Sequence, residues 1–188
     1  MNNKDLLKPT IWAYDKFRQD GSIILLNGTS SAGKGSIATE LLKILTKPYV
    51  LFSLDNFLSD YKFNNDEESC SEYIKNIKGY YLSVLSFYNE GNNIIVDTVF
   101  QDGIYDYKYT QSIFSGKKII YIAVKCSLEE LKKREINRGN RHIGLAEFQY
   151  YRVHNGVNYD YEVDTTIHSP EKCAANIIEY INNNENKN

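Results

Sequence analysis

The stretch Ser22–Ser36, SIILLNGTSSAGKGS, constrains the fold of this chain more than any other. An apolar run, Ile23–Leu26, leads into a loop that contains Gly28 and Gly33, and Lys34 then opens a helical pattern. This order of strand, glycine-rich loop and helix is the context of a phosphate-binding P-loop. Glycine lets the backbone turn tightly and approach a ligand, and the N–H groups converge at a positive helix N-terminus. An ordinary Gly/Ser turn between a strand and a helix is the alternative interpretation.

The P-loop interpretation assigns phosphate binding to the whole loop. Its predicted nucleotide-binding residues are Gly28, Thr29, Ser30, Ser31, Ala32, Gly33, Lys34, Gly35 and Ser36. Lys34 adds a full charge aimed at the β- and γ-phosphates. The motif departs from its usual form at one position, because Gly35 stands where a magnesium-holding Ser or Thr is expected and the hydroxyl comes one residue later, on Ser36. The departure concerns the metal geometry more than the nucleotide.

Apolar, strand-like segments alternate with helical patterns from residue 22 onward. The predicted strands are 23–27, 49–52, 93–96, 119–124 and 159–163, and the predicted helices are 34–45, 72–88, 107–114, 128–138, 145–154 and 170–181. Ser69 and Glu72 are predicted to form a capping box for the second helix. Such alternation is typical of a parallel α/β sheet with helices on both faces. Ligands of these sheets bind at the carboxyl ends of the strands, so the chemistry is expected there.

Length and composition fit one domain of ordinary character. The 188 residues are 42% hydrophobic, and the net charge is −2. We predict a single domain over 22–182, an N-terminal extension over 1–21 and a disordered tail over 183–188. The charge favours neither nucleic acid nor a membrane surface as a partner. Three separate cysteines, no apolar leader and no bilayer-length apolar run predict a cytoplasmic protein; the oligomeric state stays open.

Two acidic residues follow the second and third predicted strands. Asp55 is placed to face a γ-phosphate across the strand-end crevice, where a carboxylate can accept the proton of an attacking hydroxyl. Asp97 follows an apolar strand beside the P-loop, which resembles a Walker B acid that holds magnesium directly or through water. Ser36 and Asp97 are therefore the predicted metal ligands. The alternatives are that Asp55 caps a short helix starting at Asn56, and that Asp97 is a polar strand end.

Arginines gather around the end of the helix predicted at 128–138. Arg134 and Arg138 share one face, and Arg141 follows a glycine-containing turn. Glu130, four residues before Arg134, offsets part of their repulsion. Guanidinium groups suit transferring phosphoryl oxygens, so we predict a closing lid in which Arg138 and Arg141 also bind the nucleotide. The alternative is that these arginines only complement the helix dipole.

The segment 164–168 is expected near the nucleotide base, by analogy with the fold alone. The three histidines are scattered along the chain, and we interpret them as structural or solvent-facing. They are His142, His154 and His168.

Several of these stretches together resemble the chloramphenicol phosphotransferase-like family of P-loop kinases. The similarity runs from about residue 22 to 181, and its most specific parts are the loop at 25–34, IIVDTVF at 94–100 and the block 124–166. It implies a three-layer P-loop kinase fold with strand order 2-3-1-4-5, and phosphorylation of a small-molecule hydroxyl with ATP and Mg²⁺. It also implies that Asp55 is the base. Lys34 matches the P-loop lysine, and Arg134, Arg138 and Arg141 match lid arginines.

The chain departs from the family in two places. Thr98 stands where a second acid is expected after Asp97, and the segment 57–81, which should build the acceptor pocket, matches poorly. The kinase core is therefore expected to carry over, and the acceptor is not. We predict catalytic roles for Asp55, Lys34, Arg134 and Arg138 in an ATP-dependent kinase of a small molecule, such as the antibiotic chloramphenicol. The alternatives are a kinase of a nucleotide or other metabolite, and a nucleotide-binding regulatory module without transfer activity.

Overall fold

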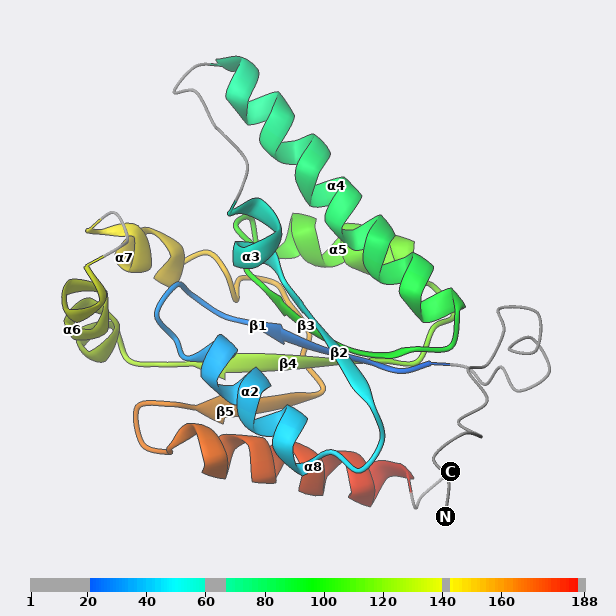
Figure 1. Ribbon diagram of the computed structural model, residues 1–188. Helices are drawn as coiled ribbons and strands as arrows, with labels where there is room; N and C mark the ends of the chain where they lie inside the picture. The colour runs from blue at the N-terminus through cyan, green and yellow to red at the C-terminus, as the bar shows by residue number, and fades with distance from the viewer. Residues whose placement is uncertain (1–20, 60–66, 140–142, 186–188) are drawn as a thin grey trace, which may run out of the picture.

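A five-stranded parallel sheet forms the centre of the molecule (Figure 1). The computed structural model describes residues 21–59, 67–139 and 143–185. The strands are β1 (Ile23–Asn27), β2 (Tyr49–Ser53), β3 (Asn93–Thr98), β4 (Ile119–Lys125) and β5 (Tyr161–Asp164). Their order is β2-β3-β1-β4-β5, with every neighbouring pair parallel. This confirms the expected sheet and strand order, and it brings all carboxyl strand ends to one edge.

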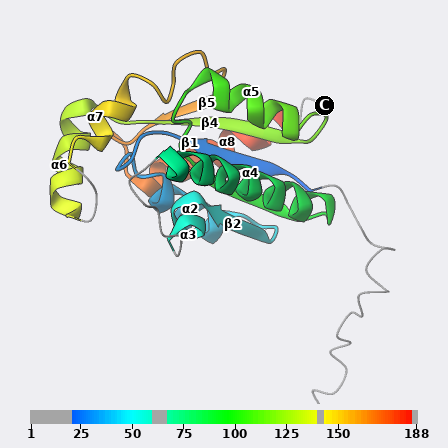
Figure 2. The same cartoon turned by 90° about the horizontal axis from the view of Figure 1, so that it is seen from above.

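Helices cover both faces of the sheet, as Figures 1 and 2 show. On one face, α2 (Lys34–Ile44) and α8 (Pro170–Glu185) pack on the sheet through an aliphatic core that includes Ile37, Leu41 and Ile177. On the other, α4 (Glu67–Asn89) and α5 (Ile104–Ile113) pack through a core rich in tyrosine and phenylalanine. β1 lies between both cores and is buried at every position, which explains its continuous apolar sequence.

Three further helices surround the carboxyl ends of the strands. They are α3 (Leu54–Leu58), α6 (Leu128–Arg138) and α7 (Leu145–Tyr150). Figure 2 places α6 and α7 together at that end of the sheet. The side chain of Ser127 caps α6 by accepting the Glu130 N–H at 3.3 Å, as its sequence predicts. Among the helices of the described segments, none combines the length and apolar character of a membrane span.

Three helices differ from their predicted bounds by at least four residues at one end. α4 begins at Glu67, so Ser69 lies inside the helix and the predicted capping box is wrong. α7 ends at Tyr150, four residues early, because the chain turns there and the Val153 carbonyl accepts a hydrogen bond from Asn27 instead. α8 continues to Glu185, so residues 183–185 are helical and the predicted disordered tail is wrong at those positions. Residues 1–20 and 186–188 lie outside the described part, so the predicted extension, the rest of the tail and the domain division stay predictions.

Candidate active site

A cavity of about 1060 Å³ opens at the carboxyl edge of the sheet, where the sequence places the chemistry. Its walls come from the P-loop, the segments around the ends of β2 and β3, the helices α6 and α7 of the predicted lid, and the segment after β5. Residues lining it include Ser30, Ser31, Gly33, Lys34, Gly35, Ser36, Asp55, Asn56, Tyr73, Asp97, Gln101, Arg134, Arg138, Gln149, Thr165 and His168. The expected residues of five separate segments therefore share one cavity.

The backbone of the P-loop explains two of its glycines. A Cβ on Gly28 would lie 2.3 Å from the carbonyl oxygen of Val124, so no larger residue fits between β1 and β4. Gly33 has φ +91° and stands at the N-cap of α2. Glycine has no side chain with which to cap the helix. The left-handed backbone turns the start of α2 toward the cavity and leaves its first N–H groups for a ligand.

The ammonium group of Lys34 lies over the P-loop. Its Nζ donates to the carbonyl oxygens of Gly28 and Thr29, both at 2.9 Å, and lies 3.9 Å from Oδ1 of Asp97. The residue is only 8% exposed, so its ammonium group is held in one place above the loop and is largely shielded from water. Phosphate bound in the loop would meet this charge directly.

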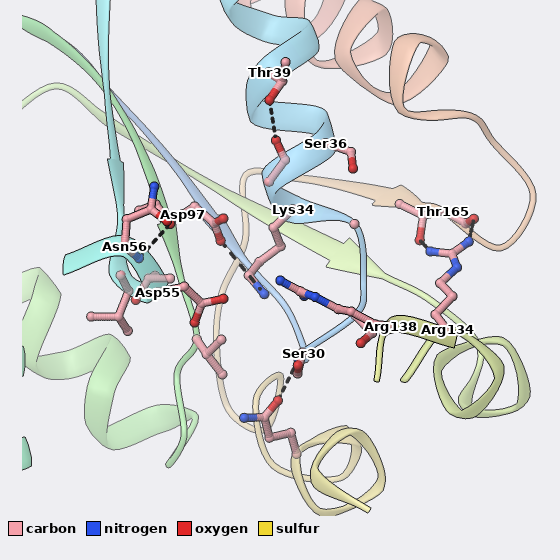
Figure 3. A pocket seen from close by; sticks show the side chains of 18 of the residues that line it. Ser30, Lys34, Ser36, Thr39, Asp55, Asn56, Asp97, Arg134, Arg138 and Thr165 are labelled. Atoms are coloured by element: carbon pink, nitrogen blue, oxygen red, sulfur yellow. Dashed lines mark hydrogen bonds and ion pairs between the residues drawn. The ribbon is translucent and has the colours of Figure 1, made fainter. Parts of the chain in front are cut away.

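Asp97 approaches the position where the P-loop lacks its usual hydroxyl. A Cβ on Gly35 would lie 3.4 Å from Oδ2 of Asp97, at the near edge of ordinary contact. Ser36 also lines the cavity, but Figure 3 shows it on the other side of the first turn of α2, away from Asp97. The two predicted metal ligands thus reach the cavity from different sides.

Asp55 does not cap a helix at Asn56. Instead α3 begins at Leu54, and its cap is Ser53, whose Oγ accepts the Asn56 N–H at 3.5 Å. Asp55 therefore stands in the first helical turn with its carboxylate in the cavity, facing the same space as Lys34 (Figure 3). The capping interpretation of Asp55 is wrong, and its carboxylate lies at the cavity.

The two described lid arginines differ in surroundings. Arg134 is fixed: its Nε donates to Glu130 at 2.8 Å, while Nη1 and Nη2 donate to the side chain and carbonyl of Thr165 at 3.0 and 2.8 Å. Arg138, one turn later, is exposed and extends into the cavity toward Lys34 (Figure 3). Arg141 lies outside the described residues. The helix thus supplies one anchored and one projecting guanidinium group.

Four polar residues that the sequence did not single out support the site. They are Asn27, Glu135, Gln149 and Thr165, and each is at most 5% exposed. Thr165 donates to the carbonyl of Ala32 at 2.8 Å, so it joins Arg134 to the P-loop. Both carboxylate oxygens of Glu135 accept N–H groups at the start of α7, from Gly144 and Ala146 at 2.8 Å, so α6 and α7 are held together.

Asn27 ends β1 and ties three segments together. Its Oδ1 accepts the Phe100 N–H at 2.8 Å, and its Nδ2 donates to the Val153 carbonyl at 2.8 Å and to the Tyr159 hydroxyl at 2.6 Å. Nδ1 of His154 completes this cluster by a hydrogen bond of 2.8 Å to the same hydroxyl. Burial, together with the nearby charge of Lys125, lowers the pKa of His154 to about 4. The hydrogen bond and partial burial of His154 agree with its interpretation as a structural residue. His168 is exposed and lines the cavity, and His142 lies outside the described residues.

A model of the chloramphenicol phosphotransferase-like protein family matches residues 21–182. The chain belongs to this family. Among curated relatives, the putative O-phosphotransferase Rv2636 of Mycobacterium tuberculosis is 26% identical and covers 85% of this chain, with 82% of its own length matched. The adenylyl-sulfate kinase of Clostridium acetobutylicum is 25% identical over 96% of this chain and 97% of its own.

Solved structures confirm the P-loop kinase fold of this family member. The APS kinase CysC of Mycobacterium tuberculosis, in complex with AMPPNP and APS, gives a TM-score of 0.68 at 13% identity and covers 87% of this chain and 98% of its own. Shikimate kinase of Acinetobacter baumannii, in complex with shikimate, gives 0.65 at 14% identity, with coverages of 91% and 98%. The chain is thus a member of a kinase-like phosphotransferase family.

Proposed function

We propose that this protein transfers the γ-phosphate of ATP to a hydroxyl group of a small molecule, with Mg²⁺ bound. One observation carries the proposal: Lys34, Asp97, Asp55 and Arg138, from four separate segments, face one cavity beside a P-loop. Phosphoryl transfer depends on positioning and charge, and this set provides a phosphate cradle, two carboxylates and two cations.

The residues present fit a bound nucleotide and metal. Gly33 leaves a left-handed backbone at the start of α2, and the buried hydroxyls of Ser30 and Ser31 have no hydrogen-bond partner among the described residues. An anion held by the loop is the kind of ligand that satisfies such donors. Asp97, with Ser36 as the second candidate, would hold Mg²⁺, and the ion would neutralise charge on phosphate oxygens.

Asp55 is the proposed general base. The acceptor oxygen forms a bond to the γ-phosphorus while the bond from phosphorus to the bridging oxygen of ADP breaks, and ADP leaves with that electron pair. The acceptor proton moves to the carboxylate of Asp55. Arg138 projects toward the transferring group and offsets its charge, while Arg134, held by Thr165, keeps α6 against the P-loop.

The acceptor side of the cavity combines neutral polar groups with an aromatic ring. Asn56, Tyr73 and Gln101 line it around Asp55. Burial raises the pKa of Tyr73, so its hydroxyl stays protonated and can donate to an acceptor molecule. The family description makes an antibiotic alcohol such as chloramphenicol the first acceptor to test. A nucleotide-type acceptor is the second candidate, because the matching adenylyl-sulfate kinase covers nearly the whole chain.

The proposed setting is the cytoplasm, where ATP is abundant and thiols stay reduced. Cys126 and Cys173, the cysteines whose side chains are described, are buried and free.

The test is to incubate the protein with ATP, Mg²⁺ and a library of hydroxyl compounds that includes chloramphenicol and adenylyl sulfate. Mass spectrometry then detects an added phosphoryl group. Lys34→Ala should abolish turnover. Asp55→Asn should keep ATP binding and lower kcat by roughly 10²–10⁴-fold, the range for a lost general base. Glu162→Gln, an acid-to-amide change on an exposed carboxylate paired with Lys125, is the control and should keep wild-type turnover.

Three outcomes separate the candidates. Wild-type turnover by Asp55→Asn would contradict the assigned base. A product from adenylyl sulfate alone would favour the second candidate. ATP binding without any phosphorylated product would favour a regulatory module over an enzyme.

A further inference from the structure

A single buried amide connects three parts of the cavity wall. Gln149 lies on α7 and is 2% exposed. Its Oε1 accepts the backbone N–H of Ser30 in the P-loop at 2.6 Å, and its Nε2 donates to Oε1 of Gln101 at 3.2 Å. The lid, the P-loop and the segment after β3 therefore meet at one side chain.

The connection continues to the acceptor side. Gln101 and Tyr73 of α4 line the same cavity as Ser30 and Gln149. The Asp55 carboxylate is close enough to Tyr73 to raise the pKa of its hydroxyl further. Two hydrogen bonds, from Ser30 to Gln149 and from Gln149 to Gln101, therefore lead along the wall from the P-loop toward Tyr73 and the proposed base.

The P-loop end of these two hydrogen bonds lies where the terminal phosphate is expected. Ser30 follows Thr29, whose carbonyl accepts a hydrogen bond from the Lys34 ammonium group. That ammonium group reaches the β- and γ-phosphates in P-loop proteins. Any shift of the loop on nucleotide binding therefore moves the N–H that Gln149 holds.

We propose that Gln149 is a positioning residue that couples nucleotide binding in the P-loop to the acceptor wall through Gln101. The inference rests on the proposed function of the site. A buried amide that loses one partner leaves an unsatisfied polar group, so Gln149 follows Ser30 when the loop moves and displaces Gln101 with it. The side chain of Tyr73 and its neighbours on the acceptor side then change position before the acceptor binds.

The experiment uses ¹⁵N-labelled full-length protein, with Mg²⁺ and AMPPNP as the probe. Amide exchange and chemical shifts are measured with and without the probe, and its affinity is measured by calorimetry. Gln149→Met removes both hydrogen bonds at similar size, Gln149→Glu keeps an acceptor for Ser30, and Gln101→Met removes only the second link. Gln111→Met is the control, because Gln111 also donates a side-chain hydrogen bond, to Tyr107 on α5.

We expect Gln149→Met to speed exchange of the Ser30 amide by roughly five- to tenfold, the loss of one hydrogen bond, and Gln149→Glu to preserve its protection. In the wild type and in Gln111→Met, AMPPNP should shift the amide signals of residues 73 and 101. In Gln149→Met and Gln101→Met, AMPPNP should still bind, and the shift at residue 73 should disappear.

An unchanged shift at residue 73 in Gln149→Met would overturn the inference and leave the proposed function standing. If Gln149→Met loses the shift at residue 73 but also gives the spectrum of a molten protein, that variant has a folding defect. Gln101→Met is then the decisive variant, and an unchanged AMPPNP-induced shift at residue 73 in it would overturn the inference as well. Failure of the wild-type protein to bind Mg²⁺·AMPPNP would contradict both proposals.

Discussion

The carboxylate of Glu135 should contribute more to stability than any exposed acid on the same helix. It is 2% exposed, and its two oxygens accept the N–H groups of Gly144 and Ala146 at the start of α7. Hydrogen bonds to a charged group contribute about 1.5–3 kcal/mol each. Glu135→Gln keeps the size of the side chain and one acceptor oxygen, but turns an amide NH₂ toward the other N–H. One hydrogen bond is lost, so the free energy of unfolding should fall by about 2–3 kcal/mol.

Urea denaturation followed by circular dichroism measures this difference, and thermal unfolding gives a second estimate. For a chain of this size, about 2–3 kcal/mol corresponds to a drop in Tm of roughly 5–10 °C. Glu129→Gln is the matched control, because Glu129 lies on the same helix, is 81% exposed and pairs with Lys133 four residues away. It should change stability by less than about 0.5 kcal/mol.

Equal effects of the two substitutions would refute the reasoning. They would mean that the lid helices are not joined through Glu135, or that water replaces its hydrogen bonds without cost. A large effect confined to Glu135→Gln, with faster amide exchange in α7, would support a single lid unit.

Three further predictions concern stability. Burial holds the pKa of His154 near 4, below its usual 6.5, so the unfolded chain binds the extra proton first as the pH falls from 6.5 to 4. The free energy of unfolding should therefore drop by up to about 3 kcal/mol over that window. The free energy of unfolding of His154→Asn should depend less on pH over the same range. Gly28→Ala should destabilise the protein by about 1–3 kcal/mol, because the added Cβ meets the carbonyl of Val124. Gly79→Ala should stabilise it by about 0.5–1 kcal/mol in the same assay, because Gly79 lies within α4 and an added Cβ there meets no other atom. Thr165→Val should leave the buried carbonyl of Ala32 and the half-buried Arg134 without their hydrogen bonds and cost about 1–3 kcal/mol. The control is Thr46→Val, which replaces an exposed hydroxyl.

The sequence predicted those parts of the site that follow directly from local order. A glycine-rich loop after an apolar strand can have few other conformations, and parallel strands bring their carboxyl ends together whatever the loops contain. Asp55 and Asp97 were therefore located by their places after β2 and at the end of β3. Their chemical roles stay proposals, because order along the chain does not specify distances.

The supporting residues could not be found in this way, since their partners are far along the chain. Gln149 contacts Ser30 across 119 positions, and Asn27 contacts Val153 across 126. Weak signals existed: Glu135 shares a helix face with buried Leu131, and Asn27 is a polar residue ending an otherwise apolar strand. A polar residue on a buried face predicts a partner, but its identity depends on tertiary packing.

Tyr80 of α4 connects the end of β2, which leads to Asp55, with the end of β3, which carries Asp97. Its hydroxyl lies 2.8 Å from the carbonyl oxygen of Phe52 and 3.2 Å from that of Asp97, and its ring packs edge-on against Phe57 and Phe52. The ends of β2 and β3 are thus joined by a helix that takes no part in forming the P-loop. Under the proposed function, substitutions on this helix would alter the acceptor side while the phosphate-binding loop keeps its structure.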